Sequence, residues 1–522
     1  MIDGLVLVCG SAFLGGTLAL LSRRRPSLLE LTRTFAFAAA AAVVVFHLLP
    51  EVLPALGPKA LLWIGVGFVL PWLLEVGARA VGPGFLERRG LHGMRVAAEV
   101  GFVALIFHSV VEGLALLAAL QAREDRVDLQ IAILAHHAPL TAAVALPFLE
   151  LLGPRSAAIR VGLVALAGAV GIAMGQLIPG LAQGSDAALI QRATAVTAGA
   201  LLHVVSDEIR TQCFASRWQR AGDLVASLAG VALAGAGASL DLRNAPTIFS
   251  FGRTALSLAL ATAPAVLLGI ACEAAVVRFA HRASFRIREQ LEGAFVTVAV
   301  LGFPSAIVRV ALGLLAVPAA RFAGGRRDVV GELRPDLTGR GPWLLALLAL
   351  AASVDVLAPA DWFVDLGMPG LVILAAALAF SARASASGGA LLAAALVHRG
   401  MPAELAVSFL ALSAFAGRRR PIWRWAAAAA GGFGVSLLAA AALGRIGLLR
   451  GAAAHATSAF AGSELPAAVQ LTRAPFATAC LVALGATALW MMWGTGVRGW
   501  FAPLRHPELG RRAAAPATAD AA

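Results

Sequence analysis

Residues 104–113 read Ala-Leu-Ile-Phe-His-Ser-Val-Val-Glu-Gly, which places an imidazole and a carboxylate inside an apolar run long enough to cross a membrane. The next apolar run contains a second such stretch, residues 135–139, Ala-His-His-Ala-Pro. Ionisable side chains are costly in hydrocarbon, so their presence there indicates a functional site. His108 and Glu112 are four residues apart and share one helix face, whereas neighbouring residues such as His136 and His137 diverge by about 100°. We expect the two segments to face each other and to hold a divalent metal ion.

The composition is that of an all-α polytopic membrane protein. Of 522 residues, 60% are hydrophobic and 14% are charged, against roughly 25% charged residues in soluble domains. The mean hydropathy is +0.84, and apolar runs of about 20 residues recur, the length of a transmembrane helix. The net charge of +13 is expected mainly in cytoplasmic loops of such a protein and does not indicate a nucleic-acid partner.

Several kinds of site are not expected. The cysteines are isolated, with no CxxC pair, which argues against a thiolate metal site or a disulfide framework; they are Cys9, Cys213, Cys272 and Cys480. No nucleophile–base pair or phosphate-binding loop stands out, so we do not expect an enzyme. The first apolar run lacks a basic leading segment and indicates a transmembrane helix rather than a cleavable signal.

The first half of the chain contains eight expected spans. They cover about residues 2–21, 35–55, 60–78, 96–120, 128–152, 158–181, 189–210 and 222–240. The loops between them alternate in charge. Thirteen arginines lie in or near the odd-numbered loops: Arg23, Arg24, Arg25, Arg33, Arg79, Arg88, Arg89, Arg95, Arg155, Arg160, Arg210, Arg217 and Arg220. Four basic residues lie in or near the even-numbered loops: Lys59, Arg123, Arg126 and Arg192.

Basic loops stay in the cytoplasm, so both ends of this half, including the N-terminus, are expected outside. This is the pattern of a multi-pass protein of a bacterial-type inner (plasma) membrane, surrounded by lipid. A polar, proline-bearing stretch at residues 241–246 marks the expected boundary. We predict one domain at residues 1–241, a second transmembrane helical domain at 242–500, and a disordered cytoplasmic tail at 501–522.

Two apolar segments of the second domain are interrupted. Residues 292–320 are broken at Gly302-Phe303-Pro304, and residues 388–417 are broken between His398 and Pro402. One interpretation is a pair of re-entrant hairpins, as in transporters with broken helices. The other is a pair of proline-kinked spans or of short packed helices. Uninterrupted spans are expected at about 254–278, 342–358, 368–383, 423–442 and 474–494.

Three histidine–acid pairs with four-residue spacing mark the first domain. They are His47/Glu51, His108/Glu112 and His203/Asp207, the last followed by Glu208. Imidazole with carboxylate suits Zn²⁺ and other first-row divalent ions better than Ca²⁺ or Mg²⁺. By the expected topology the pairs sit at the outer mouth, the midplane and the inner exit of an ion pathway. Pro50 and Pro139 each remove a helix hydrogen bond beside a histidine and can open the helix there.

These residues resemble the ZIP family of zinc/iron permeases over about residues 1–241. His47-Leu-Leu-Pro-Glu51 resembles its second-helix motif and His108-Ser-Val-Val-Glu112-Gly its fourth-helix motif. His136-His137-Ala-Pro139 resembles its fifth-helix motif, and residues 198–208 resemble a late helix with a small-residue start and an acidic end. The resemblance implies an eight-helix transporter of a divalent metal cation, most readily zinc.

Two departures from the family bear on the number of metal ions. The family's fifth-helix glutamate after the proline is Leu140 here, and its asparagine after the fourth-helix histidine is Ser109. In the family these residues help to form a two-metal centre. We therefore predict one metal site, with His108, Glu112, His136 and His137 as ligands.

The second domain faintly resembles a permease family implicated in metal and metalloid efflux. The likeness lies in residues 388–417, while Ser385 and Ser387 stand where that family has a cysteine. Two alternatives to zinc transport stay open: a non-transporting metal sensor or scaffold with a degenerate site, and a solute permease working through the second domain. Small-residue faces such as Gly10 and Gly15 are compatible with a homodimer and with internal packing.

Overall fold

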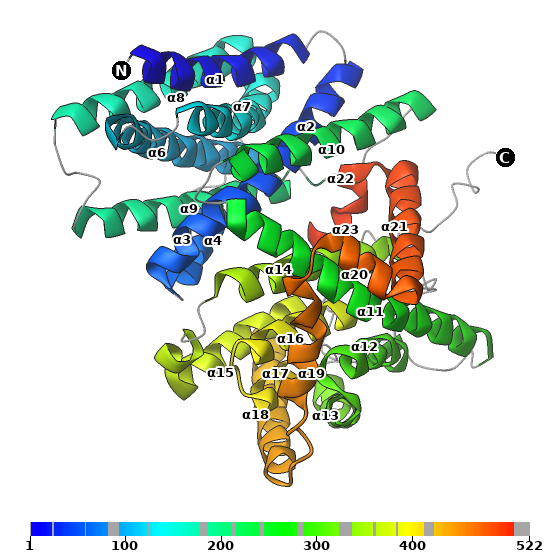
Figure 1. Ribbon diagram of the computed structural model, residues 1–522. Helices are drawn as coiled ribbons and strands as arrows, with labels where there is room; N and C mark the ends of the chain where they lie inside the picture. Colours follow the sequence, from blue (N-terminus) through cyan, green and yellow to red (C-terminus); the bar gives the residue numbers. More distant parts are fainter. Residues whose placement is uncertain are drawn as a thin grey trace. The chain divides into compact units, whose positions relative to one another are not determined.

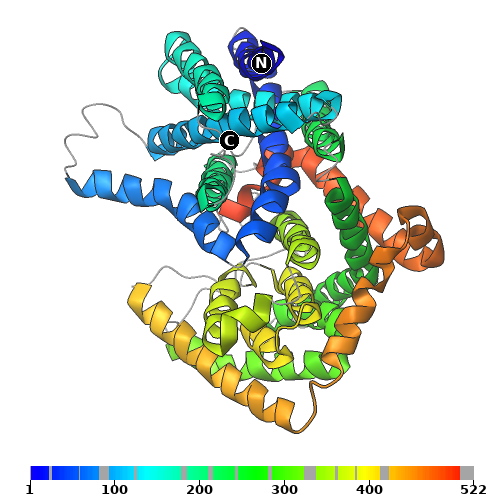
Figure 2. The same ribbon diagram turned by 60° about the vertical axis from the view of Figure 1, so that its left-hand side comes forward.

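All regular secondary structure that the computed structural model describes is helical, and no strand occurs among the described residues (Figures 1 and 2). The described part omits residues 1, 23–25, 58, 82–92, 123–125, 178–184, 208, 210–215, 241–244, 280–284, 323–336, 359–361, 383–384, 412–421 and 506–522. The chain divides into two units. Unit 1 comprises residues 1–249 and 492–501, and unit 2 comprises residues 250–491 and 502–522.

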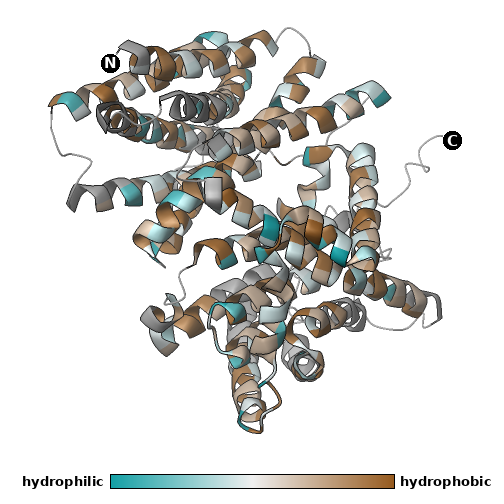
Figure 3. Cartoon of the chain, viewed as in Figure 1, coloured by the Kyte–Doolittle hydropathy of each residue, from teal (hydrophilic) through white to brown (hydrophobic). Residues whose placement is uncertain are grey.

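The helices are those of a membrane protein. Within the described residues, six are long and apolar enough to span a membrane: Gly4–Ser22, Ser27–Leu56, Pro154–Leu177, Thr247–Val276, Arg340–Leu357 and Pro475–Thr495. Hydrophobic residues predominate along the helices in Figure 3. Large apolar side chains also point outward, among them Phe13, Trp72 and Trp490, as expected for surfaces that face lipid. The prediction of an all-α polytopic membrane protein is confirmed.

Each of the eight spans expected in the first half coincides with a helix over most of its length; residues 178–181, 208 and 210 of these spans lie outside the described residues. The elements of unit 1 are α1 (Ile2–Ser22), α2 (Pro26–Val43), η1 (Val44–Leu48), α3 (Leu49–Leu56), α4 (Lys59–Val81), α6 (Gly93–Ala122), α7 (Arg126–Leu151), α8 (Pro154–Leu177), α9 (Ser185–Asp207), α10 (Arg217–Leu240) and α22 (Val497–Trp500). Several helices extend past the expected spans. Arg33 and Arg160, expected in loops, therefore lie within α2 and α8.

Helix α7 is the central helix of unit 1. It packs against α1, α2, α6, α8 and α10, and every side chain from residue 137 to 149 is buried. Glycines let its neighbours approach closely. A Cβ atom built on Gly15 of α1 would lie 2.1 Å from the carbonyl oxygen of Ala138, and one on Gly113 of α6 would lie 2.3 Å from that of Gly168 of α8. Such small-residue contacts are typical of helix packing in membranes.

The second span widens into a π-helix at the predicted histidine. Residues 44–48 form one π-helical turn, η1, and α3 follows with Pro50 in its first turn. Pro50 lacks the N–H that would bond the carbonyl four residues earlier, so an α-helical ladder cannot pass this point unchanged. π-Helical turns are frequent at functional sites. The turn contains His47 and packs against α9.

A short segment near the C-terminus belongs to unit 1. In α22, the Val497 N–H donates to Oδ2 of the buried Asp223 at 2.7 Å, and Arg498 pairs with Glu30. Asp223 also accepts from the Thr34 hydroxyl of α2 at 2.5 Å. Unit 1 is therefore not continuous in sequence, which the order of spans along the chain did not indicate.

Unit 2 is built around α16. Its elements are α11 (Ala245–Phe279), α12 (Phe285–Leu301), α13 (Phe303–Phe322), α14 (Leu337–Leu357), α15 (Trp362–Ala382), α16 (Ala386–His398), α17 (Ala403–Ala411), α18 (Ile422–Arg445), α19 (Ala452–Phe460), η3 (Ala461–Glu464), α20 (Ala467–Arg473), α21 (Pro475–Thr495) and α23 (Ala502–Arg505). All side chains of α16 from Ala386 to Val397 are buried, and α12, α14, α15, α17 and α19 pack around them.

Both interruptions expected in the second half are present as breaks between two helices. Gly302, with φ of +85°, separates α12 from α13, and Gly400, with φ of +103°, lies between α16 and α17. Each pair folds back so that its two helices pack together. The buried Arg309 of α13 donates to the carbonyl oxygens of Gly293 at 2.7 Å and Ala386 at 3.0 Å, which ties α13 to α12 and α16. Whether the pairs re-enter a membrane stays a prediction.

Candidate metal centre in unit 1

Helix α6 presents the central histidine and carboxylate on its inner face. His108 is 3% exposed and Glu112 is 7% exposed, whereas the neighbouring Phe107 is 58% exposed. This alternation follows from the rotation of about 100° per helical residue. Nε2 of His108 lies 3.6 Å from Oε1 of Glu112, as the four-residue spacing predicts. The Thr197 hydroxyl of α9 donates to the Ala104 carbonyl at 3.4 Å, one turn before His108.

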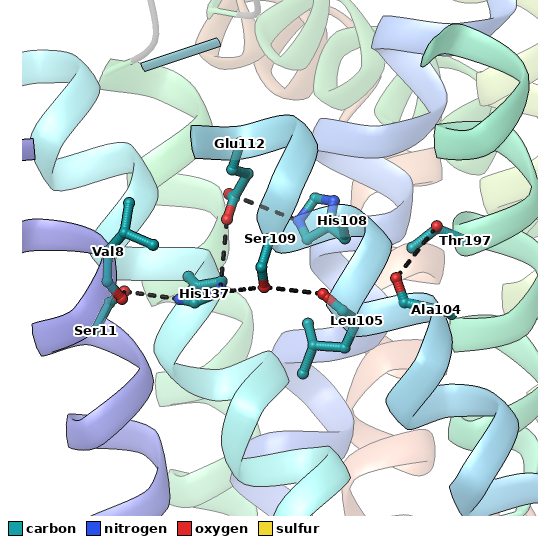
Figure 4. A network of polar contacts seen from close by, with 9 residues as sticks. All are labelled: Val8, Ser11, Ala104, Leu105, His108, Ser109, Glu112, His137 and Thr197. Atoms are coloured by element: carbon teal, nitrogen blue, oxygen red, sulfur yellow. Dashed lines mark hydrogen bonds and ion pairs between the residues drawn. The ribbon is translucent and has the colours of Figure 1, made fainter. Parts of the chain in front are cut away.

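His137 of α7 meets the other oxygen of the same carboxylate (Figure 4). Its Nε2 lies 3.6 Å from Oε2 of Glu112 and 3.0 Å from the Ser109 hydroxyl. Its Nδ1 lies 2.7 Å from the hydroxyl of Ser11, on α1. The ring is fully buried. Three helices thus converge on one imidazole, and Glu112 stands between His108 and His137.

The two serines constrain where the protons of His137 lie. Ser109 is also 2.8 Å from the Leu105 carbonyl, and Ser11 is 2.9 Å from the Val8 carbonyl. A hydroxyl has one proton to donate. If both serines donate to these carbonyls, both ring nitrogens must donate to the serines, which is the imidazolium form. With a neutral ring, one serine must turn its proton from the carbonyl to His137.

The pair distances suit a metal ion, but the described side chains do not complete a site. Zn–N and Zn–O bonds of about 2.0–2.2 Å in a tetrahedron place two ligand atoms about 3.4 Å apart, close to the 3.6 Å separations at Glu112. No group of three His, Cys, Asp or Glu side chains that could hold a metal occurs among the described residues. His136 lies on α7, but its side chain is outside that set.

The other predicted pathway residues lie on neighbouring elements. His47 of η1 and Glu51 of α3 are partly buried, and both elements pack against α9. His203 of α9 meets the ring of Phe68 of α4 edge-on, with ring centroids 5.5 Å apart. Asp207 ends α9; its side chain and the whole of Glu208 lie outside the described residues.

Sequence reasoning missed Ser11. It lies in the first apolar span, 126 residues before His137, and a single serine in such a span carries no signal for a partner so distant. The π-helical turn at His47 was also not predicted, although Pro50 indicated that the helix opens there. Ser109 was noted as a departure from the family motif, and its contact with His137 became visible only in the fold.

Comparison with known proteins finds a similarity to one protein family in part of unit 1. Residues 87–237 match the family model described as ZIP Zinc transporter. The match includes the segments that carry His108, Glu112, His136, His137 and His203, and it begins after His47 and Glu51. No curated protein and no solved structure matches the chain. Residues 87–237 are therefore similar to the ZIP zinc transporter family, within a longer membrane protein whose described secondary structure is helical.

Proposed function

We propose that unit 1 transports Zn²⁺ across the membrane through the site around Glu112. The observation that carries the proposal is the buried carboxylate with an imidazole nitrogen 3.6 Å from each of its oxygens, inside the region that matches the family. The match supports divalent metal transport, and it agrees with the expectation that the chain is not an enzyme. The choice of zinc and the ligand set belong to the proposal.

The chemistry of the ligands favours zinc and similar first-row ions. Two imidazoles and a carboxylate supply the nitrogen and oxygen donors that Zn²⁺ takes in four-coordinate sites, whereas Mg²⁺ and Ca²⁺ prefer oxygen alone. We propose His108, Glu112, His136 and His137 as the ligands. Pro139, two residues after His137, interrupts the hydrogen-bond ladder of α7 beside the two proposed histidine ligands.

Release of the ion follows from the contacts of His137. Its Nε2 can bind a metal only when it carries no proton and leaves the Ser109 hydroxyl, 3.0 Å away. Ser109 and the metal therefore compete for Nε2. The hydrogen bond between Ser11 and Nδ1, on the opposite side of the ring, is retained. A partner at the far nitrogen orients a metal-binding histidine and raises its basicity. Such competition keeps a transport site from holding its ion too tightly.

The remaining predicted residues would form the approaches to this site. We propose His47 and Glu51 at the outer mouth, where the π-helical turn leaves the helix open. His203, Asp207 and Glu208 would form the inner exit at the end of α9. This direction assumes an outer N-terminus in a bacterial-type inner membrane, the arrangement that the arginine distribution favours.

Uptake of ⁶⁵Zn²⁺ into proteoliposomes tests the proposal. We expect wild-type protein to take up zinc, Glu112→Gln and His137→Ala to lose uptake, and His455→Ala in unit 2 to retain it as a matched control for loss of a histidine. Equal uptake by wild type and Glu112→Gln would overturn the transport site. Zinc binding by wild type without uptake would instead support the sensor or scaffold alternative.

A further inference from the structure

The break between α16 and α17 in unit 2 carries a second buried ionic group. Asp355 of α14 is 5% exposed. Its Oδ1 lies 3.4 Å from Nε2 of His398 and 3.2 Å from Nε of Arg399, and its Oδ2 accepts from the Thr254 hydroxyl of α11 at 3.4 Å. His398 ends α16, and Arg399 is the next residue. One carboxylate oxygen thus serves two basic side chains at the end of the central helix.

Arg399 makes this group a poor metal site. A guanidinium remains protonated at all relevant pH values, so a fixed positive charge already lies 3.2 Å from the carboxylate. A divalent cation would have to displace it. A proton can bind to His398 without first displacing Arg399, because it adds a single positive charge to a ring that already faces Asp355.

Two features of the surroundings of His398 bear on a second ring proton. The ring of Phe460 favours a positive charge on the imidazole, whereas the contacts at Nδ1 and at the shared oxygen of Asp355 would have to change. The ring stacks on Phe460 of α19, with centroids 4.6 Å apart and planes at 8°, and an aromatic face attracts a cation. Its Nδ1 is buried and has no hydrogen-bond partner among the described residues. That suits the neutral ring with its proton on Nε2, toward Asp355. Protonation would place an unpartnered N–H at Nδ1 and a second cation on the oxygen shared with Arg399.

Among the side chains that the structure describes, the other charged groups of the helices around α16 have partners away from His398. Among described side chains, His398 faces only Asp355, Arg399 and Phe460 from these elements. His455 of α19 faces Gly302, Glu404 of α17 faces Gly444 of α18, and Arg340 of α14 pairs with Glu273 of α11. His398 is therefore the group whose proton can change the charge at this break.

We propose that unit 2 contains a proton-binding site at His398, Asp355 and Arg399, and that the bound proton releases the turn between α16 and α17. The protonated ring takes over Oδ1 of Asp355, and Arg399 leaves it. Three backbone bonds hold this turn: from the N–H groups of Arg399, Gly400 and Met401 to the carbonyls of Ala395, Val397 and Leu396. Without the anchor of Arg399 on Asp355, these bonds open more often.

Hydrogen exchange of full-length protein in lipid nanodiscs tests this, using peptides that cover residues 395–411 between pH 5 and pH 8. Exchange times are scaled for the intrinsic effect of pH on amide exchange. We expect protection at Gly400 and Met401 to fall at least fivefold at the acidic end. His398→Gln keeps a donor for Asp355 but cannot take up a proton, so its protection should stay high throughout.

Two further variants complete the design. Arg399→Gln should give low protection at every pH, because the anchor is absent. His455→Gln, the same substitution on a histidine that faces Gly302, should respond to pH like wild type. The proposal fails if wild type shows no response, or if His398→Gln responds like wild type. Because the readout is confined to unit 2 and needs no zinc, its failure is distinct from failure of zinc transport by unit 1.

Discussion

Helix α7 of unit 1 and helix α16 of unit 2 are both buried central helices, and each brings a histidine to a buried carboxylate on a neighbouring helix. His137 of α7 and His108 of α6 face separate oxygens of Glu112, also on α6. In α16, His398 shares a single oxygen of Asp355 with Arg399. The two histidines that face Glu112 can lose their protons and bind a metal, whereas Asp355 already has a permanent cation beside it. This difference underlies the two proposals, metal binding at the first carboxylate and proton binding at the second.

The largest expected effect separates the two carboxylates directly. Glu112→Gln removes the negative charge that faces both histidines, and we expect zinc uptake to fall by more than about 100-fold, beyond the 10–100-fold typical of lost outer-shell partners. Asp355→Asn should leave zinc uptake within about twofold of wild type, because that carboxylate has no part in the proposed metal site. Initial rates of ⁶⁵Zn²⁺ uptake measure both. Similar losses of zinc uptake in Glu112→Gln and Asp355→Asn would contradict the different roles proposed for the two carboxylates.

The backbone contacts around the two helices differ as well. A Cβ on Gly15 would lie 2.1 Å from a backbone oxygen next to His137, and backbone cannot move aside, whereas one on Gly388 of α16 would meet the side chain of Leu347. Gly15→Ala should therefore push α1 away from α7 and lower the free energy of unfolding by about 1–3 kcal/mol, as is typical of overpacking. Zinc uptake should fall as well. Gly388→Ala should cost less.

Thermal unfolding in detergent checks this second prediction, with Gly10→Ala as the control on the same helix. A Cβ on Gly10 meets nothing within 4 Å, and alanine favours a helix over glycine by about 1 kcal/mol. Gly10→Ala should thus be neutral or slightly stabilising. Equal unfolding temperatures for the Gly10 and Gly15 variants would contradict the close contact of α1 with α7.

The sequence allowed the prediction of local features of both sites but not of their tertiary partners. The spacing of His108 and Glu112 predicted their shared face, and glycine with proline predicted the breaks at Gly302 and Gly400. Nothing in the sequence decides whether His136 or His137 meets Glu112, because adjacent residues on a buried helix both lie in apolar surroundings. The pairing of Asp355 with His398 likewise depends on how α14 packs against α16.

Two other features depend on contacts between distant parts of the chain. The bond from Val497 to Asp223 joins residues 274 positions apart, and it assigns α22 to unit 1 although the preceding span belongs mostly to unit 2. Helix α19 was not expected as a span, because residues 452–460 are too short to cross a membrane. Yet it supplies Phe460, the ring on which His398 stacks. Short helices of this kind become informative only when their neighbours are known.

An intermediate effect is expected at Ser11, which has no counterpart at His398. Ser11→Ala removes the partner at Nδ1 of His137, so the ring loses its fixed orientation. Loss of such a partner typically weakens metal binding by about 10-fold or more. Calorimetric titration of purified protein with Zn²⁺ gives the affinity, and the matched control is Ser239→Ala, a change to a partly exposed serine of α10 outside the proposed site. Unchanged affinity in Ser11→Ala would remove α1 from the site.

The smallest effect should have the opposite sign. Ser109→Ala removes the hydroxyl that competes with the metal for Nε2 of His137, and a net hydrogen bond contributes about 0.5–1.5 kcal/mol. Zinc affinity in the same titration should therefore rise by about 2- to 10-fold. Uptake should slow when release limits the rate, because the ion leaves more slowly when no hydroxyl reclaims the ring. Weaker binding in Ser109→Ala would mean that Ser109 supports the metal site rather than competing with it. In that case Ser109 and the metal would not exchange at Nε2 of His137. The two helices would then no longer differ in this respect: Nε2 of His137 leaves its hydroxyl partner to bind a metal, whereas Nε2 of His398 stays on Asp355.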